Sequence, residues 1–201
     1  MKTRIALCAA ALLGATAVNT AFAFDQGDWL VRFGLSDIDP KSDNSPIVSV
    51  DSAWGATFNF TYMMTDNWAV EVLAAWPYEH DISLVGGPEV ASTEHLPPTV
   101  SLQYHFMADS TFQPYVGLGV NYTMFFSEDT YGELEGSDLS LDDSWGLAYE
   151  LGADFMLGET WFLNASFRYI DIETDASVNG DFLGTVEIDP WVYGAHLGFR
   201  F

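Results

Sequence analysis

The chain has 201 residues, of which 29 are acidic and only 6 are lysine or arginine, so its formal net charge is −23 at pH 7. So few cations cannot neutralise a phosphate backbone, which disfavours nucleic-acid binding. Hydrophobic residues make up 49% of the chain. Beyond the first segment, however, no apolar run approaches the roughly 18 residues that a membrane helix needs.

The first segment has the pattern of a cleaved secretory signal. Two basic residues precede an apolar run too short to span a bilayer, and Ala21-Phe22-Ala23 follows as a small-x-small cleavage site. We therefore expect residues 1–23 to be removed and residues 24–201 to form a single domain. The only cysteine, Cys8, would leave with the signal, so we expect no disulfide, thiolate metal site or cysteine nucleophile.

Period-two alternation predicts eight β-strands in the rest of the chain, each with one apolar face and one polar or small-residue face. In the second strand, for example, Phe58 and Phe60 alternate with Thr57, Asn59 and Thr61. The predicted strands lie near residues 28–35, 53–64, 68–76, 99–106, 115–122, 145–157, 161–169 and 185–201.

The lengths of the connections predict how these strands are arranged. Short turns follow the second, fourth and sixth strands, and long links follow the first, third, fifth and seventh. This pattern is typical of outer-membrane barrels, which have short periplasmic turns and long extracellular loops. We therefore predict an all-β fold: an eight-stranded antiparallel transmembrane β-barrel with four long extracellular loops, located in the outer membrane of a Gram-negative cell. Tryptophans and tyrosines near the strand ends suit its two interfacial belts.

The last strand supports closure into a barrel. It ends on Phe201 with no polar tail, and a soluble protein seldom leaves such an aromatic strand as an open edge. Closure removes the edge and lipid covers the apolar face. The alternative is a final strand of a soluble sandwich. We expect the barrel-assembly machinery to recognise this C-terminal strand.

The acidic residues gather in the long links, which hold 21 of the 29 carboxylates. They predict a solvated, self-repelling outer surface. Divalent cations bridging this surface to anionic lipopolysaccharide form one hypothesis. No loop has the spacing of an EF-hand, and we expect neither a cofactor nor a bound metal in a defined site.

The period-two alternation predicts that a set of charged residues points into the lumen. A barrel of eight strands is wide enough only for side chains or one small ligand. Charges at bilayer depth are tolerable when they pair inside. The predicted polar closure consists of Glu71, Glu150, Asp154, Arg168 and Arg200. It is interpreted either as a structural plug or as a constriction that regulates passage.

Apolar residues near the outer strand ends predict a pocket for a small hydrophobic compound. The candidates for lining it are Leu73, Leu96, Phe125, Phe162 and Ile170. A small loop-covered core explains the same residues equally well.

Catalysis has little support in the sequence. The four histidines lack zinc-binding spacing, and there is no Gly-x-Ser-x-Gly motif or phosphate-binding glycine loop. His80 and His95 flank the second long link and are expected to face one another as a neutral pair. A Ser–His acyl hydrolase stays open as a remote alternative, because its partners need not be close in sequence. We predict that the chain is not an enzyme.

Several sequence blocks resemble the outer membrane protein W family, and together they cover essentially the whole predicted mature chain in order. The blocks are residues 60–67 (FTYMMTDN), 70–77 (VEVLAAWP), 95–99 (HLPPT), 114–126 (PYVGLGVNYTMFF), 137–146 (SDLSLDDSWG), 169–174 (YIDIET), 189–193 (DPWVY) and 198–201 (GFRF).

The resemblance implies a narrow apolar upper channel above a polar lower closure. It also implies passive uptake of small hydrophobic molecules, with sideways exit into the membrane. Leu73 matches a family position lining that channel. Arg168 departs from the family, which can carry a large apolar side chain there, and a charge at this level would make the constriction more polar. The alternative is a sealed structural or receptor barrel that acts through its acidic loops, as a phage or bacteriocin receptor or in envelope stress.

Overall fold

The structure, a computed structural model, describes residues 23–201 of the chain. The predicted signal peptide, residues 1–23, therefore lies outside the described residues except for Ala23. The strands of the main barrel are β1 (Trp29–Asp39), β3 (Ala53–Met63), β4 (Trp68–Ala75), β7 (Thr99–His105), β8 (Phe112–Thr130), β10 (Ser144–Met156), β11 (Trp161–Ile170) and β14 (Trp191–Arg200).

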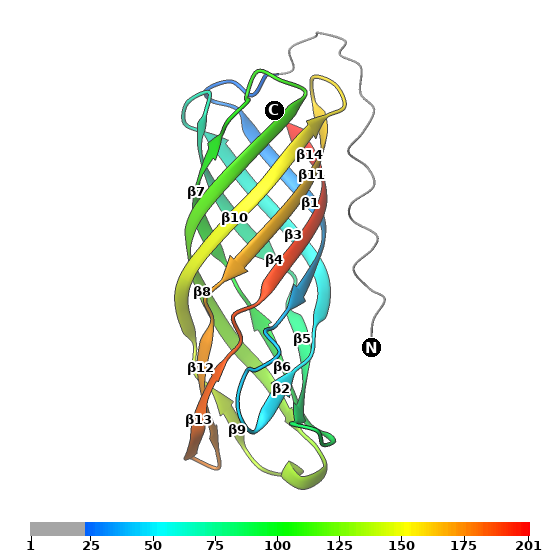
Figure 1. The fold of residues 1–201 in the computed structure, drawn as a ribbon, viewed down its shortest axis with the longest axis vertical. Helices are drawn as coiled ribbons and strands as arrows, with labels where there is room; N and C mark the ends of the chain where they lie inside the picture. Colours follow the sequence, from blue (N-terminus) through cyan, green and yellow to red (C-terminus); the bar gives the residue numbers. More distant parts are fainter. Residues whose placement is uncertain (1–22) are drawn as a thin grey trace.

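These eight strands close on themselves. They are hydrogen-bonded in the order β10-β11-β14-β1-β3-β4-β7-β8, and β8 pairs with β10 to complete the circle (Figure 1). Every pair is antiparallel, and β14 pairs with β1 in a register that places Phe199 opposite Val31. The C-terminal strand therefore has no open edge. The predicted eight-stranded antiparallel barrel is confirmed.

The outer surface of the barrel is apolar and carries aromatic residues in two groups. At the short-turn end, Trp29 packs against Tyr62, with ring centroids 5.0 Å apart, and Trp161 packs against Phe199 at 5.0 Å. Toward the long links, Trp145 is 73% exposed. Such side chains suit the water–lipid interfaces, and the aliphatic residues between them suit hydrocarbon. Within the part of the chain that the structure describes, no helix is long and apolar enough to span a bilayer.

The long links, predicted as four long loops without strands of their own being assigned, contain further strands. These are β2 (Val48–Val50), β5 (Tyr78–Leu84), β6 (Glu89–Leu96), β9 (Leu139–Leu141), β12 (Glu173–Val178) and β13 (Asp181–Glu187), with a 3-10 turn η1 (Gly132–Leu134). The predicted last strand near 185–201 is also corrected. Thr185 belongs to β13, which ends at Glu187. The strand structure is interrupted at Asp189, which has a φ of 38°, and at Pro190, which lacks an amide donor.

The added strands form two sheets beyond the barrel rim. The first loop sheet consists of β2, β5, β6 and the outer part of β8, and the second loop sheet consists of β9, β12 and β13. Both extend from the same end of the barrel, at the bottom of Figure 1. Buried apolar residues between them form one core, which includes Phe125, Ile170 and Ile172. A second, separate core with Phe24 and Phe162 lies among residues of the short-turn end.

Candidate functional site

Five charged side chains meet inside the barrel. The Arg32 guanidinium donates to both carboxylate oxygens of Asp154, at 3.0 and 2.7 Å, and to Glu71 at 3.0 Å. Arg168 donates to Glu71 at 2.8 Å and to Glu150 at 2.6 Å. None of the five is more than 5% exposed. We call this set the lumen network.

Polar side chains extend the lumen network to every strand of the barrel. Gln103 of β7 donates to Glu150 at 2.9 Å, and Tyr115 of β8 donates to it at 3.2 Å. Gly152 leaves room for the Tyr115 ring, since a Cβ there would lie 2.3 Å from it. The remaining members are Thr57, Asn59 and Thr61 of β3, Asn164 of β11 and His196 of β14. The lumen is thus crossed by hydrogen bonds from all sides.

One predicted member of the polar closure is wrong, and one actual member was missed. Arg200 pairs with Asp28 at 3.5 Å and with the Ala23 carbonyl at the short-turn end, because it sits where β14 leaves the barrel. Arg32 takes its place. Its position between the outward residues Val31 and Phe33 already pointed it inward, so period-two alternation could have identified it.

Aromatic packing closes the short-turn end of the barrel, on the side of the lumen network that faces away from the loop sheets. The Phe24 ring lies 5.3 Å from Phe162 and 5.9 Å from His105. The Arg32 guanidinium lies over the Phe162 ring at 5.6 Å. Phe162 therefore does not line an outer pocket, as predicted, but belongs to this opposite end. The reason is its position at the start of β11, beside the short turn.

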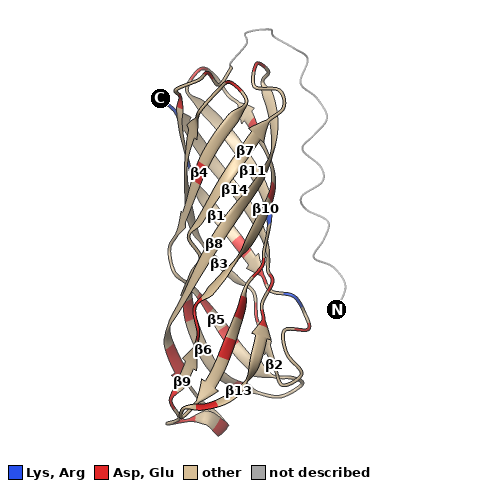
Figure 2. Ribbon diagram, turned by 90° about the vertical axis from the view of Figure 1, so that its left-hand side faces the viewer, with Lys and Arg blue, Asp and Glu red and all other residues tan. Residues whose placement is uncertain are grey.

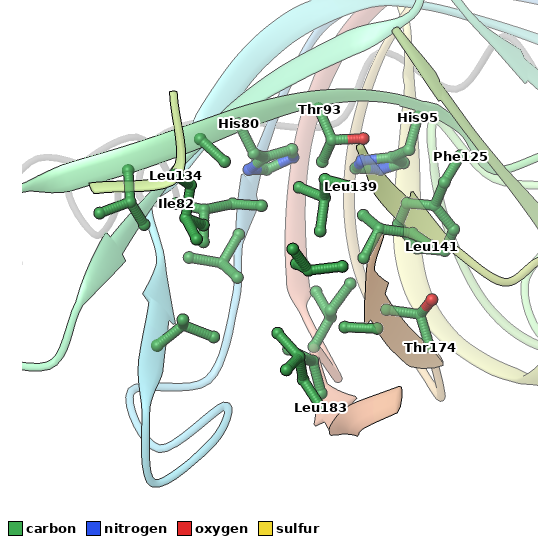
Figure 3. A pocket seen from close by; sticks show the side chains of 18 residues that line it. His80, Ile82, Thr93, His95, Phe125, Leu134, Leu139, Leu141, Thr174 and Leu183 are labelled. Carbon is green, nitrogen blue, oxygen red and sulfur yellow. The ribbon is translucent and has the colours of Figure 1, made fainter. Parts of the chain in front are cut away.

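An apolar pocket of about 80 Å³ lies between the two loop sheets. A single water needs roughly 10–15 Å³ of such space, so a small organic molecule fits. Figure 3 shows side chains from both loop sheets converging on it. Its lining comprises Val48, Val50, His80, Ile82, Val90, Ala91, Thr93, His95, Phe125, Leu134, Leu139, Leu141, Thr174, Ala176, Val178, Leu183, Val186 and Ile188. We call this space the loop pocket.

The structure places the other predicted pocket residues at different positions along the barrel axis. Phe125 lines the loop pocket, and Ile170 packs in the same core. Leu96 follows the lining residue His95, so alternation turns it to the opposite face of β6. Leu73 is buried in the barrel body, where it pairs with Asn59 and Thr99. Most of the lining comes from the long links, in which no strands were predicted from the sequence.

Two histidines form the polar part of the loop pocket. The His80 and His95 rings are stacked, with centroids 4.8 Å apart and an angle of 15° between their planes. His80 Nδ1 lies 2.5 Å from the Asp51 carbonyl oxygen. Burial lowers the pKa of His80 below its usual 6.5, and burial together with His80 lowers the pKa of His95 well below it. Both imidazoles are therefore neutral at pH 7.

A cationic clamp joins the link that precedes β2 of the first loop sheet to β13 of the second. Lys41, in the link between β1 and β2, donates to Glu187 and, at 3.1 Å, to Asp189. Asn44 adds a bond from its side-chain amide to the Glu187 carbonyl at 3.2 Å. The pair with Glu187 and the bond with Asp189 together raise the pKa of Lys41. Lys41 is thus a lone cation in the acidic loop region visible in Figure 2.

The acidic residues do not gather into a metal site. In residues 23–201, no three His, Cys, Asp or Glu side chains come together as candidate ligands. The carboxylates of the loop sheets instead lie on the outer faces of strands, as Glu79 and Asp81 do in β5.

Comparisons with known proteins agree with this architecture. The model of the OmpW family matches residues 25–201. Outer membrane protein W of Vibrio cholerae is 43% identical, over 97% of this chain and 98% of its own. The crystal structure of outer membrane protein OprG from Pseudomonas aeruginosa aligns with a TM-score of 0.81 at 39% identity, covering 90% of this chain and 99% of its own. Dibenzothiophene metabolism operon protein PahQ of Pseudomonas aeruginosa is 29% identical, over 72% of this chain and 70% of its own.

Proposed function

Since the chain belongs to the OmpW family and forms an outer-membrane β-barrel, we propose that it takes up small hydrophobic molecules passively through the loop pocket. The observation that carries this proposal is the lining of that pocket. Sixteen of its 18 lining residues are neither histidine nor charged, and most are aliphatic. A relative's place in an operon for the metabolism of dibenzothiophene, an apolar aromatic compound, supports the same class of solute.

The proposed route avoids the barrel axis. The lumen network and the Phe24–Phe162 contact lie across the straight path to the periplasm. Beyond the rim, the ladder between β8 and β10 ends at the pair Thr123–Ser144, and among the described strands β9 pairs with β12 alone. A solute in the loop pocket therefore meets less continuous hydrogen bonding at the side of the wall than along the barrel axis. We place its exit there, into the outer leaflet.

A pocket-filling variant tests the proposal. Ala176 lines the loop pocket, so Ala176→Trp should fill it and lower naphthalene uptake at least about tenfold. Uptake is measured by fluorescence in asymmetric vesicles whose outer leaflet is lipopolysaccharide, a poor solvent for such compounds. The matched control is Ala165→Trp, on the lipid-facing side of β11. Uptake unchanged by Ala176→Trp, or absent with folded wild type, overturns the proposal.

A sealed receptor barrel is the second candidate, and the closed lumen favours it. Its working surface would be the acidic outer part of residues 128–138. Changing the carboxylates in this segment to amides should then abolish binding of the surface partner, a phage or a bacteriocin, and leave naphthalene uptake intact. Wild-type partner binding by this variant would remove the candidate.

The remaining contacts follow from the outer-membrane location. The barrel sits in lipid through its apolar outer face, and we propose that the acidic loops approach lipopolysaccharide through divalent cations. Equal thermal stability with and without millimolar Mg²⁺ would exclude the bridging. We also propose that the barrel-assembly machinery recognises β14 and Phe201, and that signal cleavage leaves a chain beginning near Phe24. The burial of Phe24, which is 1% exposed, supports this start.

A further inference from the structure

His95 is a buried polar side chain without a partner. It is 2% exposed, and neither its Nδ1 nor its Nε2 has a hydrogen-bond partner. Its ring is surrounded by Tyr78 at 5.7 Å, His80 at 4.8 Å and Phe125 at 5.9 Å. Burying such a group without a hydrogen bond costs free energy, and native proteins rarely leave one in this state. A ligand that supplies the missing bonds recovers that cost.

His80 adds an acceptor of defined type. Its Nδ1 contacts the Asp51 carbonyl, which can only accept, so Nδ1 must carry the hydrogen. In a neutral imidazole this leaves Nε2 as an acceptor, and His80 Nε2 is also buried without a partner. Neutral His95 offers one N–H donor and one acceptor. The pocket thus presents both hydrogen-bonding roles within two stacked rings.

The surroundings of the two rings exclude charged ligands. Figure 3 shows His80, Thr93 and His95 along one side of the pocket, and the rest of the lining is mainly aliphatic, with Phe125 and Thr174. Thr93 is already bonded to the backbone of Glu94 and Phe126. An anion would find no cation in the lining, and a cation would lose its hydration against aliphatic walls. What remains is a neutral apolar molecule with one group that both donates and accepts.

We propose that the loop pocket selects small apolar solutes that carry a single hydroxyl group, such as phenols and short alcohols. The hydroxyl donates to His80 Nε2 and accepts from the N–H of His95. The ring centroids lie 4.8 Å apart, which is less than the roughly 6 Å that one oxygen can bridge with two hydrogen bonds of about 3 Å each. The inference rests on the proposed function and names the chemistry of its solute.

Phenol and toluene test this inference, because they have nearly the same shape and differ by a hydroxyl for a methyl group. Binding to the full barrel in bilayer discs is measured by ligand-observed NMR, with partition into protein-free discs subtracted. Wild type should bind phenol about tenfold more tightly than toluene. The variant His80→Phe/His95→Phe should lose this preference, so that it binds phenol no more tightly than toluene. Different migration of boiled and unboiled samples on gels reports that each variant is folded.

The outcomes separate this inference from the proposed function. Equal binding of both compounds to wild type, or a preference that survives in the double variant, overturns the hydroxyl selectivity while the apolar pocket stands. Failure of folded wild type to bind either compound overturns both. Phenol preference that disappears in the double variant supports the inference, and Ala176→Trp should then block both compounds.

Discussion

The lumen network and the loop pocket are two interiors of opposite kind in one chain. In the lumen network, every buried charge has a partner of opposite charge on another strand of the barrel. In the loop pocket, the walls are apolar and the two buried imidazoles keep nitrogens without partners. Both are enclosed by antiparallel strands, so secondary structure alone does not distinguish them.

The two interiors differ in how the strands that surround them are held together. Each barrel strand is paired on both sides, which fixes the Cα positions from which Arg32 and Arg168 reach their carboxylates. Buried ion pairs need such accurate placement to offset the loss of hydration. Beyond the rim the wall divides into two loop sheets, which the Lys41 clamp joins. An apolar interior tolerates movement of these sheets, because dispersion contacts are not directional.

The largest expected effect comes from breaking the lumen network. Arg32→Met leaves Asp154 without a cation, whereas Glu71 keeps Arg168, and unpairing a buried charge costs about 3–5 kcal/mol. We expect this loss in the free energy of unfolding, measured by urea titration in lipid vesicles. Arg200→Met is the matched control, since the Arg200 pair with Asp28 is partly exposed and should cost at most about 1 kcal/mol. Equal losses in the two variants would contradict the assignment.

The barrel strands could be predicted from the sequence where apolar, lipid-facing residues alternate with polar or small ones. The strands β3, β4, β10 and β11 were located closely, because large apolar residues mark every second position. Parity also turned Glu71, Glu150, Asp154 and Arg168 inward. Period-two alternation predicts whether a side chain points into the lumen, but it does not predict its position along the barrel axis. Arg200 was therefore assigned to the closure although it lies at the barrel end.

The loop sheets were missed because their outer faces contact water. In β5, Glu79 and Asp81 are exposed while His80 and Ile82 are buried, so the strand alternates between acidic and buried residues. A search for an apolar outer face overlooks this pattern, although its period is also two. The facing of His80 and His95 was inferred correctly from their places on either side of the link. The partners of their nitrogens depend on tertiary packing and could not be inferred.

The second prediction concerns pH and separates the two interiors. Because the folded pKa values of His80 and His95 lie below 6.5, the unfolded chain binds protons that the folded chain does not once the pH falls below about 6.5. Asp51 and Asp81 oppose this shift at His80, whereas His80 itself reinforces it at His95. Stability should therefore fall between pH 7 and 5, with a slope approaching about 1.4 kcal/mol per pH unit for each group.

The variant His80→Phe/His95→Phe provides the control for this slope. It removes both groups, and the free energy of unfolding in urea should then change less over the same pH range than in wild type. An identical pH profile for the two proteins would show that the pair does not resist protonation.

The third prediction reverses the sign of the first. His95→Phe replaces a ring with two unpartnered nitrogens by an apolar ring of similar shape, and it should raise the free energy of unfolding by about 1 kcal/mol. His196→Phe is the contrast, since both His196 nitrogens are bonded, to Thr57 at 2.7 Å and to Asn164 at 3.0 Å. That variant should lower stability by about 1–3 kcal/mol. Similar losses in both would mean that His95 has partners in solution.

The smallest effect on stability should come from the clamp, and it tests whether the two loop sheets separate. Lys41→Met removes ion pairs to Glu187 and Asp189 that are partly exposed, so the free energy of unfolding should fall by less than about 1 kcal/mol. The entry of a solute depends on separating the sheets rather than unfolding them, and naphthalene uptake in the asymmetric vesicles should rise severalfold. Lower uptake at unchanged stability would show instead that the clamp holds the loop pocket in its working shape. Because the same substitution leaves the lumen network untouched, faster uptake would also place the rate-limiting step at the loop sheets and not at the barrel axis.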